Sequence, residues 1–176
     1  EELGLATLLG TLTATRVRAK ETFAFAYDRA WLTSGNAQDL DPELLFFGGP
    51  QYPREKLNFG IFLASCPDRW GRFLLDRREA QTARDEGKAS RQLTESDYLL
   101  RVFDEHRMGG LRFRLSPEGP FLDDRRELSS PPWTSLRELE EASLQLERAD
   151  ASDPHYRRWL GLLIAPGCSL GGARPK

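Results

Sequence analysis

The stretch GTLTATRVRAKETFAFAYD, residues 10–28, decides the start of the fold. Within it, Thr11–Thr13 and Thr22–Tyr27 carry β-branched and aromatic residues in the alternation that is typical of strands. The basic segment from Arg16 to Lys20 lies between them and indicates a turn. These residues therefore predict two β-strands joined by a short connection near the N-terminus.

A third strand is predicted further along the chain, where leucine and phenylalanine alternate with arginine over residues 111–115. Gly109 and Gly110 precede it and indicate a tight entry into the strand. The charged residues 84–91, which include Gly87, predict an exposed loop.

Helical patterns occur in the sequence between the second and third predicted strands. Pro67 suits a first helical turn, and Trp70, Phe73 and Leu74 then fall on one face. Thr94 is a candidate N-cap ahead of a second apolar stripe, formed by Tyr98, Leu99, Val102 and Phe103. The fold class is therefore α+β, with a small and mainly antiparallel sheet that carries packed helices.

Residues 116–132 are rich in Pro, Gly, Asp and Ser, and we place a boundary between two halves of the chain there. Beyond it, Ser135 and Glu138 form a capping-box pattern ahead of Leu139, Ala142 and Leu146. A last helix follows, with Asp153 as N-cap and Pro154 at its first position. Its apolar face comprises Tyr156, Trp159, Leu160, Leu163 and Ile164, and Pro166 with Gly167 is expected to end it.

A glycine-rich run, GCSLGGARPK, covers residues 167–176. Adjacent glycines let the backbone approach a ligand closely, and successive N–H groups with a nearby lysine can hold a phosphate. The run is not a Walker A loop, which needs G-x-x-x-x-G-K-[ST]. On the residues alone, a phosphate cradle and a simple glycine turn after a helix both remain open.

The wider sequence resembles the HipA-like serine/threonine kinases, the toxin components of bacterial type II toxin–antitoxin systems. The motifs that carry the resemblance occur in order along nearly all of the chain: Leu9–Leu12, Phe23–Asp28, Trp31-Leu32, Pro67–Arg72, Asp97–Leu100, Arg107–Phe113 and Ser169–Lys176. The resemblance implies a HipA N-terminal subdomain over residues 1–118. It also implies that residues 119–176 begin the kinase core and end in its nucleotide loop.

The resemblance assigns roles to residues of that loop. It implies ATP contacts from Gly171, Gly172, Ala173, Arg174, Pro175 and Lys176. Ser169 matches the loop serine that such kinases autophosphorylate. A phosphate there adds negative charge beside the ATP phosphates, which implies autoinhibition. Pro175 has no N–H, so residues 171–173 are expected to supply most of the amide donors.

Phosphoryl transfer also needs a lysine on a following strand, an aspartate for the substrate hydroxyl and ligands for Mg²⁺. In this family those residues lie downstream of the glycine loop. We therefore expect the chain to be the N-terminal part of a longer kinase, with no catalytic residue of its own and no activity alone. The alternative is a split HipA-like toxin–antitoxin system, in which this region is made as a separate, non-catalytic regulatory module. An unrelated α+β interaction domain is a third possibility.

The resemblance also implies partners: a helix-turn-helix antitoxin of the HipB-like kind, and a protein substrate such as an aminoacyl-tRNA synthetase. The chain itself has a formal net charge of −2, which argues against direct nucleic-acid binding. No apolar run approaches a membrane span, and the two cysteines are far apart in the sequence, so a reducing cytoplasm is expected.

Other polar residues are interpreted as structural. The charge run between Asp68 and Glu79 is expected to be a solvated helix face. Asp123 and Asp124 are expected to keep a loop soluble. His106, His155 and Cys168 have no second ligand at metal spacing or no activating setting, so no metal site is predicted.

Overall fold

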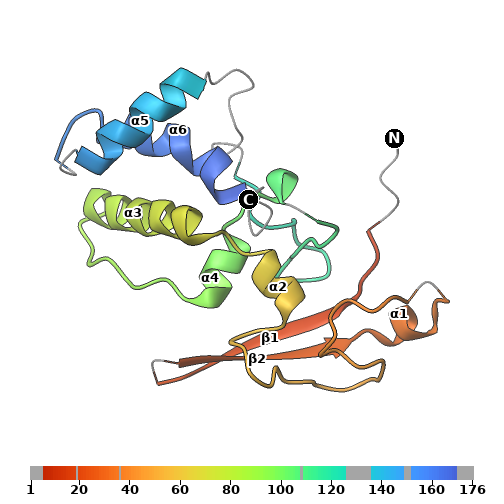
Figure 1. The fold of residues 1–176 in the computed structure, drawn as a ribbon. Helices are drawn as coiled ribbons and strands as arrows, with labels where there is room; N and C mark the ends of the chain where they lie inside the picture. The colour runs from red at the N-terminus through yellow and green to blue at the C-terminus, as the bar shows by residue number, and fades with distance from the viewer. Residues whose placement is uncertain are drawn as a thin grey trace. The chain divides into compact units, whose positions relative to one another are not determined.

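The computed structural model describes residues 6–18, 20–35, 37–107, 109–125, 136–148 and 152–169 (Figure 1). Its elements are β1 (Gly10–Val17), β2 (Lys20–Tyr27), α1 (Arg29–Thr33), α2 (Gly60–Ala64), α3 (Arg69–Asp85), α4 (Glu95–Leu100), the 3₁₀ turn η1 (Asp104–His106), α5 (Leu136–Arg148) and α6 (Tyr156–Ser169). This confirms the α+β class. The chain forms two compact units, residues 1–63 and residues 64–176. The predicted division near residue 118 stays a prediction.

The predicted strand pair is confirmed as an antiparallel hairpin. β1 and β2 pair over their full length, from Gly10 opposite Tyr27 to Val17 opposite Lys20. Arg18 in the connection has φ 59°, a left-handed conformation that a tight hairpin turn requires. The strands are longer than predicted, because the pairing continues through Ala14 to Val17 in β1 and begins at Lys20 in β2. The predicted turn from Arg16 to Lys20 is therefore shorter, since Arg16, Val17 and Lys20 belong to the strands.

The core of the first unit lies against one face of β2. Phe23, Phe25 and Tyr27 alternate along the strand and are all buried. The ring of Phe25 lies 5.0 Å from that of Tyr27 and 5.3 Å from that of Phe62 in α2. Gly10 is required opposite this cluster, because a Cβ there would lie 2.3 Å from the Ala26 carbonyl oxygen and 2.6 Å from the Phe25 ring.

A long loop of the first unit is tied to β2 by Gln51. Its backbone exchanges two hydrogen bonds with Phe25, of 2.9 and 2.8 Å. Its side-chain amide also holds Leu45, accepting from the backbone N–H and donating to the carbonyl at 2.8 Å each. The loop nevertheless exposes five large apolar side chains, which we call the apolar loop: Leu45, Phe46, Phe47, Tyr52 and Leu57.

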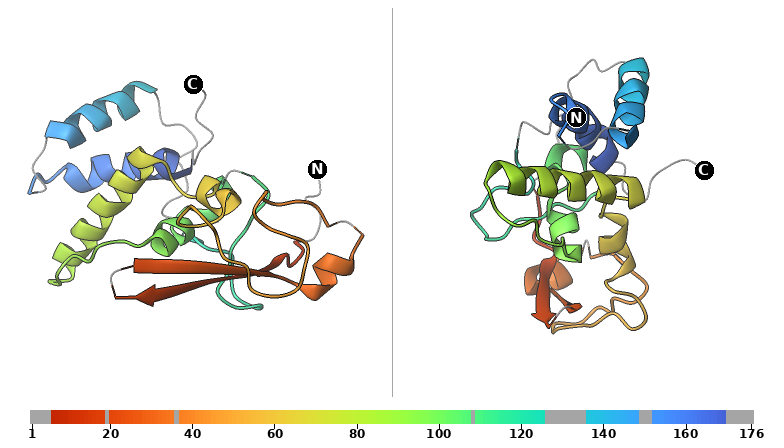
Figure 2. Two further views of the ribbon diagram at one scale, coloured as in Figure 1. Left: turned by 60° about the horizontal axis from the view of Figure 1, so that its bottom comes forward. Right: turned by 90° about the vertical axis from the view of Figure 1, so that its left-hand side faces the viewer.

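In the second unit, α6 packs on both α3 and α5 (Figures 1 and 2). The shared core contains Leu74 and Leu75 from α3, Ala142 and Leu146 from α5, and Tyr156 and Leu160 from α6, all buried. Ala142 and Leu146 lie four positions apart, as do Tyr156 and Leu160, and the adjacent Leu74 and Leu75 both lie on the buried side of α3, so each helix turns one apolar face inward. The predicted apolar faces of the three helices are confirmed where their side chains are described, and the side chain of Ile164 lies outside that part of the structure.

The helix starts follow local capping chemistry. Thr94 and Asp97 form a reciprocal capping box at α4, which confirms the predicted cap. The Asp68 carboxylate accepts from the Gly71 N–H at 2.8 Å and caps α3. Asp153 accepts from the His155 N–H at 2.8 Å, but α6 begins only at Tyr156, after Pro154. Ser135 of the predicted capping box lies outside the described residues.

Two predictions are wrong, one of a strand and one of a helix end. Residues 111–115 form no strand in the structure, only a single bridge between Phe113 and Leu122. The turn at Ser116–Gly119 brings these two residues together, but Leu115 beside them is 79% exposed, and the pairing extends no further. Pro166 and Gly167 also do not end the last helix, since α6 continues to Ser169. No helix among the described residues is long and apolar enough to cross a membrane.

Candidate functional site

The predicted nucleotide loop follows directly from α6. Ser169 is the final residue of this helix, and its side chain is outside the described part of the structure, as are residues 171–176 with Gly171, Gly172, Ala173, Arg174, Pro175 and Lys176. The structure therefore describes helix α6, which precedes the predicted loop, but not the loop itself.

This helix is held firmly at its start. Tyr156 is 2% exposed, and its hydroxyl accepts a hydrogen bond of 3.1 Å from the Arg77 guanidinium of α3. Leu160 and Leu163 lie one and two turns further on and are buried in the same core. At the surface, Arg157 donates to Asp85 at 2.6 Å. The helix that leads to Ser169 is thus fixed to α3 by apolar packing and two polar contacts.

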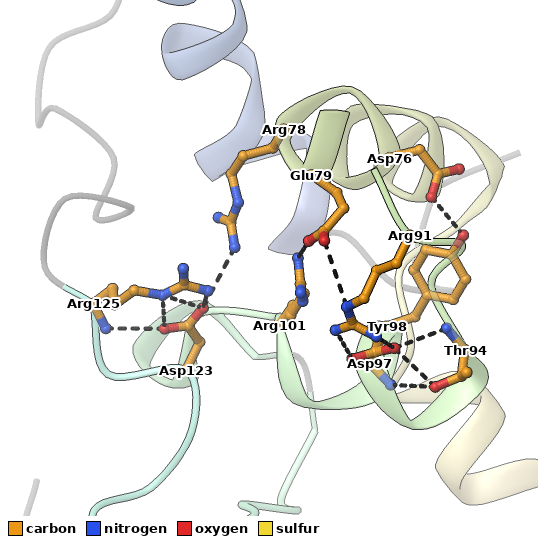
Figure 3. A network of polar contacts seen from close by, with 10 residues as sticks. All are labelled: Asp76, Arg78, Glu79, Arg91, Thr94, Asp97, Tyr98, Arg101, Asp123 and Arg125. Carbon is orange, nitrogen blue, oxygen red and sulfur yellow. Dashed lines mark hydrogen bonds and ion pairs between the residues drawn. The ribbon is translucent and has the colours of Figure 1, made fainter. Parts of the chain in front are cut away.

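A second assembly of polar side chains joins α3, α4 and the segment after Leu122 (Figure 3). Asp123 lies at one end of it, 5% exposed, and accepts two hydrogen bonds from Arg125 Nε at 2.8 and 2.9 Å. The Arg78 guanidinium of α3 lies 3.8 Å from the same carboxylate. Backbone bonds join Asp123 to Val102 at 3.0 Å and to Asp104 at 2.8 Å, so this residue is fixed from every side.

Asp97 occupies the other end of the assembly. Arg91 donates to both of its oxygens, at 2.7 and 2.6 Å, and the Thr94 N–H donates at 2.9 Å. Burial disfavours the carboxylate, but the hydrogen bonds from Arg91 and Thr94 outweigh it and lower the pKa of Asp97 to about 2. Between the two ends, Glu79 of α3 pairs with Arg101 at 2.8 Å and with Arg91 at 3.4 Å.

Tyr98 and Glu95 attach α4 to α3 on a further side. The Tyr98 hydroxyl donates to Asp76 at 2.7 Å, and burial together with that carboxylate raises the pKa of Tyr98 to about 12. Arg72 donates two hydrogen bonds to Glu95, at 2.5 and 2.7 Å, and its guanidinium also lies over the Tyr98 ring at 4.6 Å. A planar guanidinium makes such a bidentate contact and a ring contact at once.

Two sequence interpretations are corrected here. The charge run between Asp68 and Glu79 is not simply a solvated face, because Arg72, Arg78 and Glu79 are largely buried in these pairs. Asp123 does not serve only to keep a loop soluble, because it is buried and paired. Arg72 pairs with Glu95, 23 positions away, and Arg78 with Asp123, 45 positions away. No local sequence pattern marks pairs of that separation, so sequence reasoning missed the burial of these side chains.

An open hollow of about 280 Å³ adjoins this assembly, lined by Ser96, Asp97, Leu100, Arg101, Leu122, Asp123, Asp124 and Arg125. Its basic and acidic side chains are nearly balanced, and the oxygens of Asp97 and Asp123 already accept hydrogen bonds from within the chain. A nucleotide phosphate would meet three carboxylates there. The hollow is therefore a structural junction between elements rather than an anion site.

Arg107, which belongs to the motif at residues 107–113, is buried under this junction. Its guanidinium donates to the backbone carbonyls of Ser65, Val102 and Leu122 at 3.2, 3.2 and 3.0 Å. Burial lowers the pKa of Arg107 to about 10. Cys66 follows Ser65 in the sequence and is also buried, which raises the pKa of its thiol to about 11. A buried thiol of high pKa is a poor nucleophile, so Cys66 is a packing residue.

The described residues contain no group of three His, Cys, Asp or Glu side chains placed to hold a metal ion. His155 contacts the Trp159 ring at 5.9 Å, within α6 and its preceding turn. No family model, no curated protein and no solved structure matches this chain.

Proposed function

We propose that this chain is the N-terminal part of a HipA-like serine/threonine protein kinase that uses ATP and Mg²⁺. The observation that carries the proposal is the ordered series of motifs from Leu9–Leu12 to Ser169–Lys176, which ends in a glycine loop that a kinase can place over the ATP phosphates. No single motif would suffice, because a lone glycine pair occurs in many turns.

The fold is compatible with this role at α6, the helix from which the loop departs. A loop that covers phosphates needs a fixed point of departure, and α6 supplies one through its buried face against α3 and α5. In the proposed protein, residues 171–173 donate amide N–H groups to the phosphates, while Arg174 and Lys176 supply positive charge. Ser169 is the proposed site of autophosphorylation, which would turn the kinase off by charge repulsion.

The proposed partners follow from the same resemblance: a helix-turn-helix antitoxin and a protein substrate such as an aminoacyl-tRNA synthetase. The catalytic aspartate and the Mg²⁺ ligands are proposed to lie in a part of the kinase beyond Lys176. On this proposal, residues 1–176 alone transfer no phosphate.

Intact mass spectrometry tests the proposal. The protein expressed from its complete reading frame should gain one phosphate after incubation with Mg²⁺ and ATP, and fragmentation should place it on Ser169. Ser169→Ala should abolish the gain, whereas Ser143→Ala on α5 should keep it. The isolated 176-residue chain should gain nothing. A complete protein that neither binds ATP nor gains phosphate would contradict the proposal.

The apolar loop favours a second candidate, a non-catalytic regulatory module. Tyr52 is 65% exposed and Leu45 57%, although Gln51 holds the loop firmly. A fixed patch of exposed apolar side chains is typical of protein–protein contact sites. If this candidate holds, the chain added in trans should reduce phosphotransfer by a separately encoded kinase subunit. Tyr52→Ser should weaken that effect and Tyr98→Phe should not.

A further inference from the structure

The backbone of β1 has one edge that β2 does not use. Phe25 of β2 exchanges both of its backbone hydrogen bonds with Gln51, on the side of β2 away from β1. In an antiparallel ladder the facing pair Leu12–Phe25 is therefore a non-hydrogen-bonded pair. The N–H and C=O of Leu12 point to the opposite, outer edge of β1, and by alternation so do those of Gly10, Ala14 and Arg16.

This outer edge is unprotected. Among the described residues, those four have no backbone partner on that side. β1 pairs with β2 through eight consecutive residues without a bulge, it contains no proline, and its one charged residue is Arg16. Edge strands that stay solitary usually carry a proline, a bulge or several charges, and an unprotected edge is a template for another strand.

We propose that this edge pairs antiparallel with β1 of a second copy of the chain, about a two-fold axis at Thr13. In that register Leu12 faces Ala14 of the second copy and Gly10 faces Arg16, so the outward backbone groups of both strands meet in hydrogen-bonded pairs. The result is a continuous four-stranded sheet in the order β2, β1, β1, β2. This inference does not depend on the proposed kinase function.

Two features of β1 favour a second copy over an unrelated strand. The only charge on each strand, Arg16, faces Gly10 of the other copy, so no like charges stand opposite one another. On the outer face, Thr13 meets itself across the axis and Thr11 meets Thr15, which makes a ladder of threonines. Cross-strand threonine pairs are favourable, and β1 exposes these threonines to solvent in the single chain.

A cysteine scan tests the register. Thr13 pairs with Ala24 through hydrogen bonds to β2, so the Thr13–Thr13 pair of the dimer is a non-hydrogen-bonded pair with Cα atoms about 4.5 Å apart, suited to a disulfide. Two Thr11 residues would lie four positions apart along the strands, about 13 Å. In a Cys168→Ser background, Thr13→Cys should oxidise to a disulfide-linked dimer at least tenfold more than Thr11→Cys. Cys66 is buried and should not contribute.

Sedimentation of the 176-residue chain tests the dimer without oxidation. The wild-type mass should rise towards twice 20.0 kDa with concentration. Thr13→Lys should reduce the association at least tenfold, because it sets two ammonium groups face to face. Ala24→Lys, on the same sheet face but one strand inward, should reduce it less. A chain that stays monomeric, or a dimer in which Thr11→Cys and Thr13→Cys cross-link equally or not at all, would overturn the proposal.

Discussion

In the first unit, β2 turns three aromatic side chains into a core that α2 completes with Phe62, and few charges take part. In the second unit, α3, α5 and α6 share an apolar core, but α4 and the segment around Asp123 are joined to α3 largely through charged side chains. The difference matters because the apolar faces follow local sequence periodicity, whereas the pairs that α3 makes with α4 and with the Asp123 segment, such as Arg72–Glu95 and Arg78–Asp123, join positions far apart in the chain. We therefore expect the stability of the first unit to depend mainly on side-chain volume and that of the second unit to depend also on charge.

The largest effect is expected from the aromatic core of the first unit. Phe59 is fully buried, and its ring lies 6.2 Å from that of Phe62. Phe59→Ala should lower the free energy of unfolding of this unit by about 3–5 kcal/mol. Urea titration followed through the amide NMR signals of β1 and β2 measures it. Tyr52→Ala, at an exposed position, is the control and should change it by less than about 0.5 kcal/mol.

The next effect concerns charge in the second unit. Asp123→Ala removes the carboxylate that faces Arg78, whose side chain is only 13% exposed. We expect a loss of about 3 kcal/mol, since a buried guanidinium then lacks this compensation. Thermal unfolding followed by circular dichroism measures the loss. If the loss arises from charge, the double variant Arg78→Met/Asp123→Ala should be more stable than Asp123→Ala alone. Equal losses in the single and double variants would contradict it.

A smaller effect is expected at the α3–α4 contact. Arg72→Lys keeps the charge but cannot make both hydrogen bonds to Glu95 or lie flat over Tyr98. The expected cost is about 1 kcal/mol in urea titration. Lys88→Ala breaks the exposed pair with Glu86 and serves as the control. It should leave the denaturation midpoint unchanged, so equal shifts in the two variants would argue against a special role for Arg72.

The smallest effect is a pH dependence. The pKa of Asp97 falls from its ordinary 3.8 to about 2 in the folded chain. Its ionised form therefore stabilises the fold above the ordinary value, and this contribution is lost as the pH falls towards about 2. Asp97→Asn should lose less stability than the wild type across that window. Parallel acid titrations of the two proteins, followed by tryptophan fluorescence, test the sign.

Much of the fold could be predicted because it depends on local patterns. The alternation around Phe23 and Phe25 indicated β2, Thr94 indicated the start of α4, and the spacing of Leu160 and Leu163 indicated the buried face of α6. The failed strand at residues 111–115 shows the limit of this reasoning. Alternation describes a strand only when a partner strand is present, and here Leu122 alone pairs with Phe113.

The polar sites were harder to predict. Asp123 and Arg78 look like ordinary surface residues in the sequence, because their burial arises only when the segment after Leu122 bonds to Val102 and Asp104. Ser169 and the nucleotide loop rest on resemblance, and their roles stay predictions. Arg107 is intermediate between these cases: it lies in a motif of the proposed resemblance, and in the structure its guanidinium donates to three backbone carbonyls.

Charge pairs hold α4 and the Asp123 segment on α3, whereas β2 is held by backbone pairing with β1 and by apolar packing against Phe62 of α2. Native-state hydrogen exchange of Asp123→Ala tests it most directly. The described partners of Asp123 lie in the second unit, so we predict that the amides of Asp104 and Arg101 lose protection while those of β2 keep theirs. Equal loss of protection in β2 and in α4, or no loss at Asp104, would contradict the account.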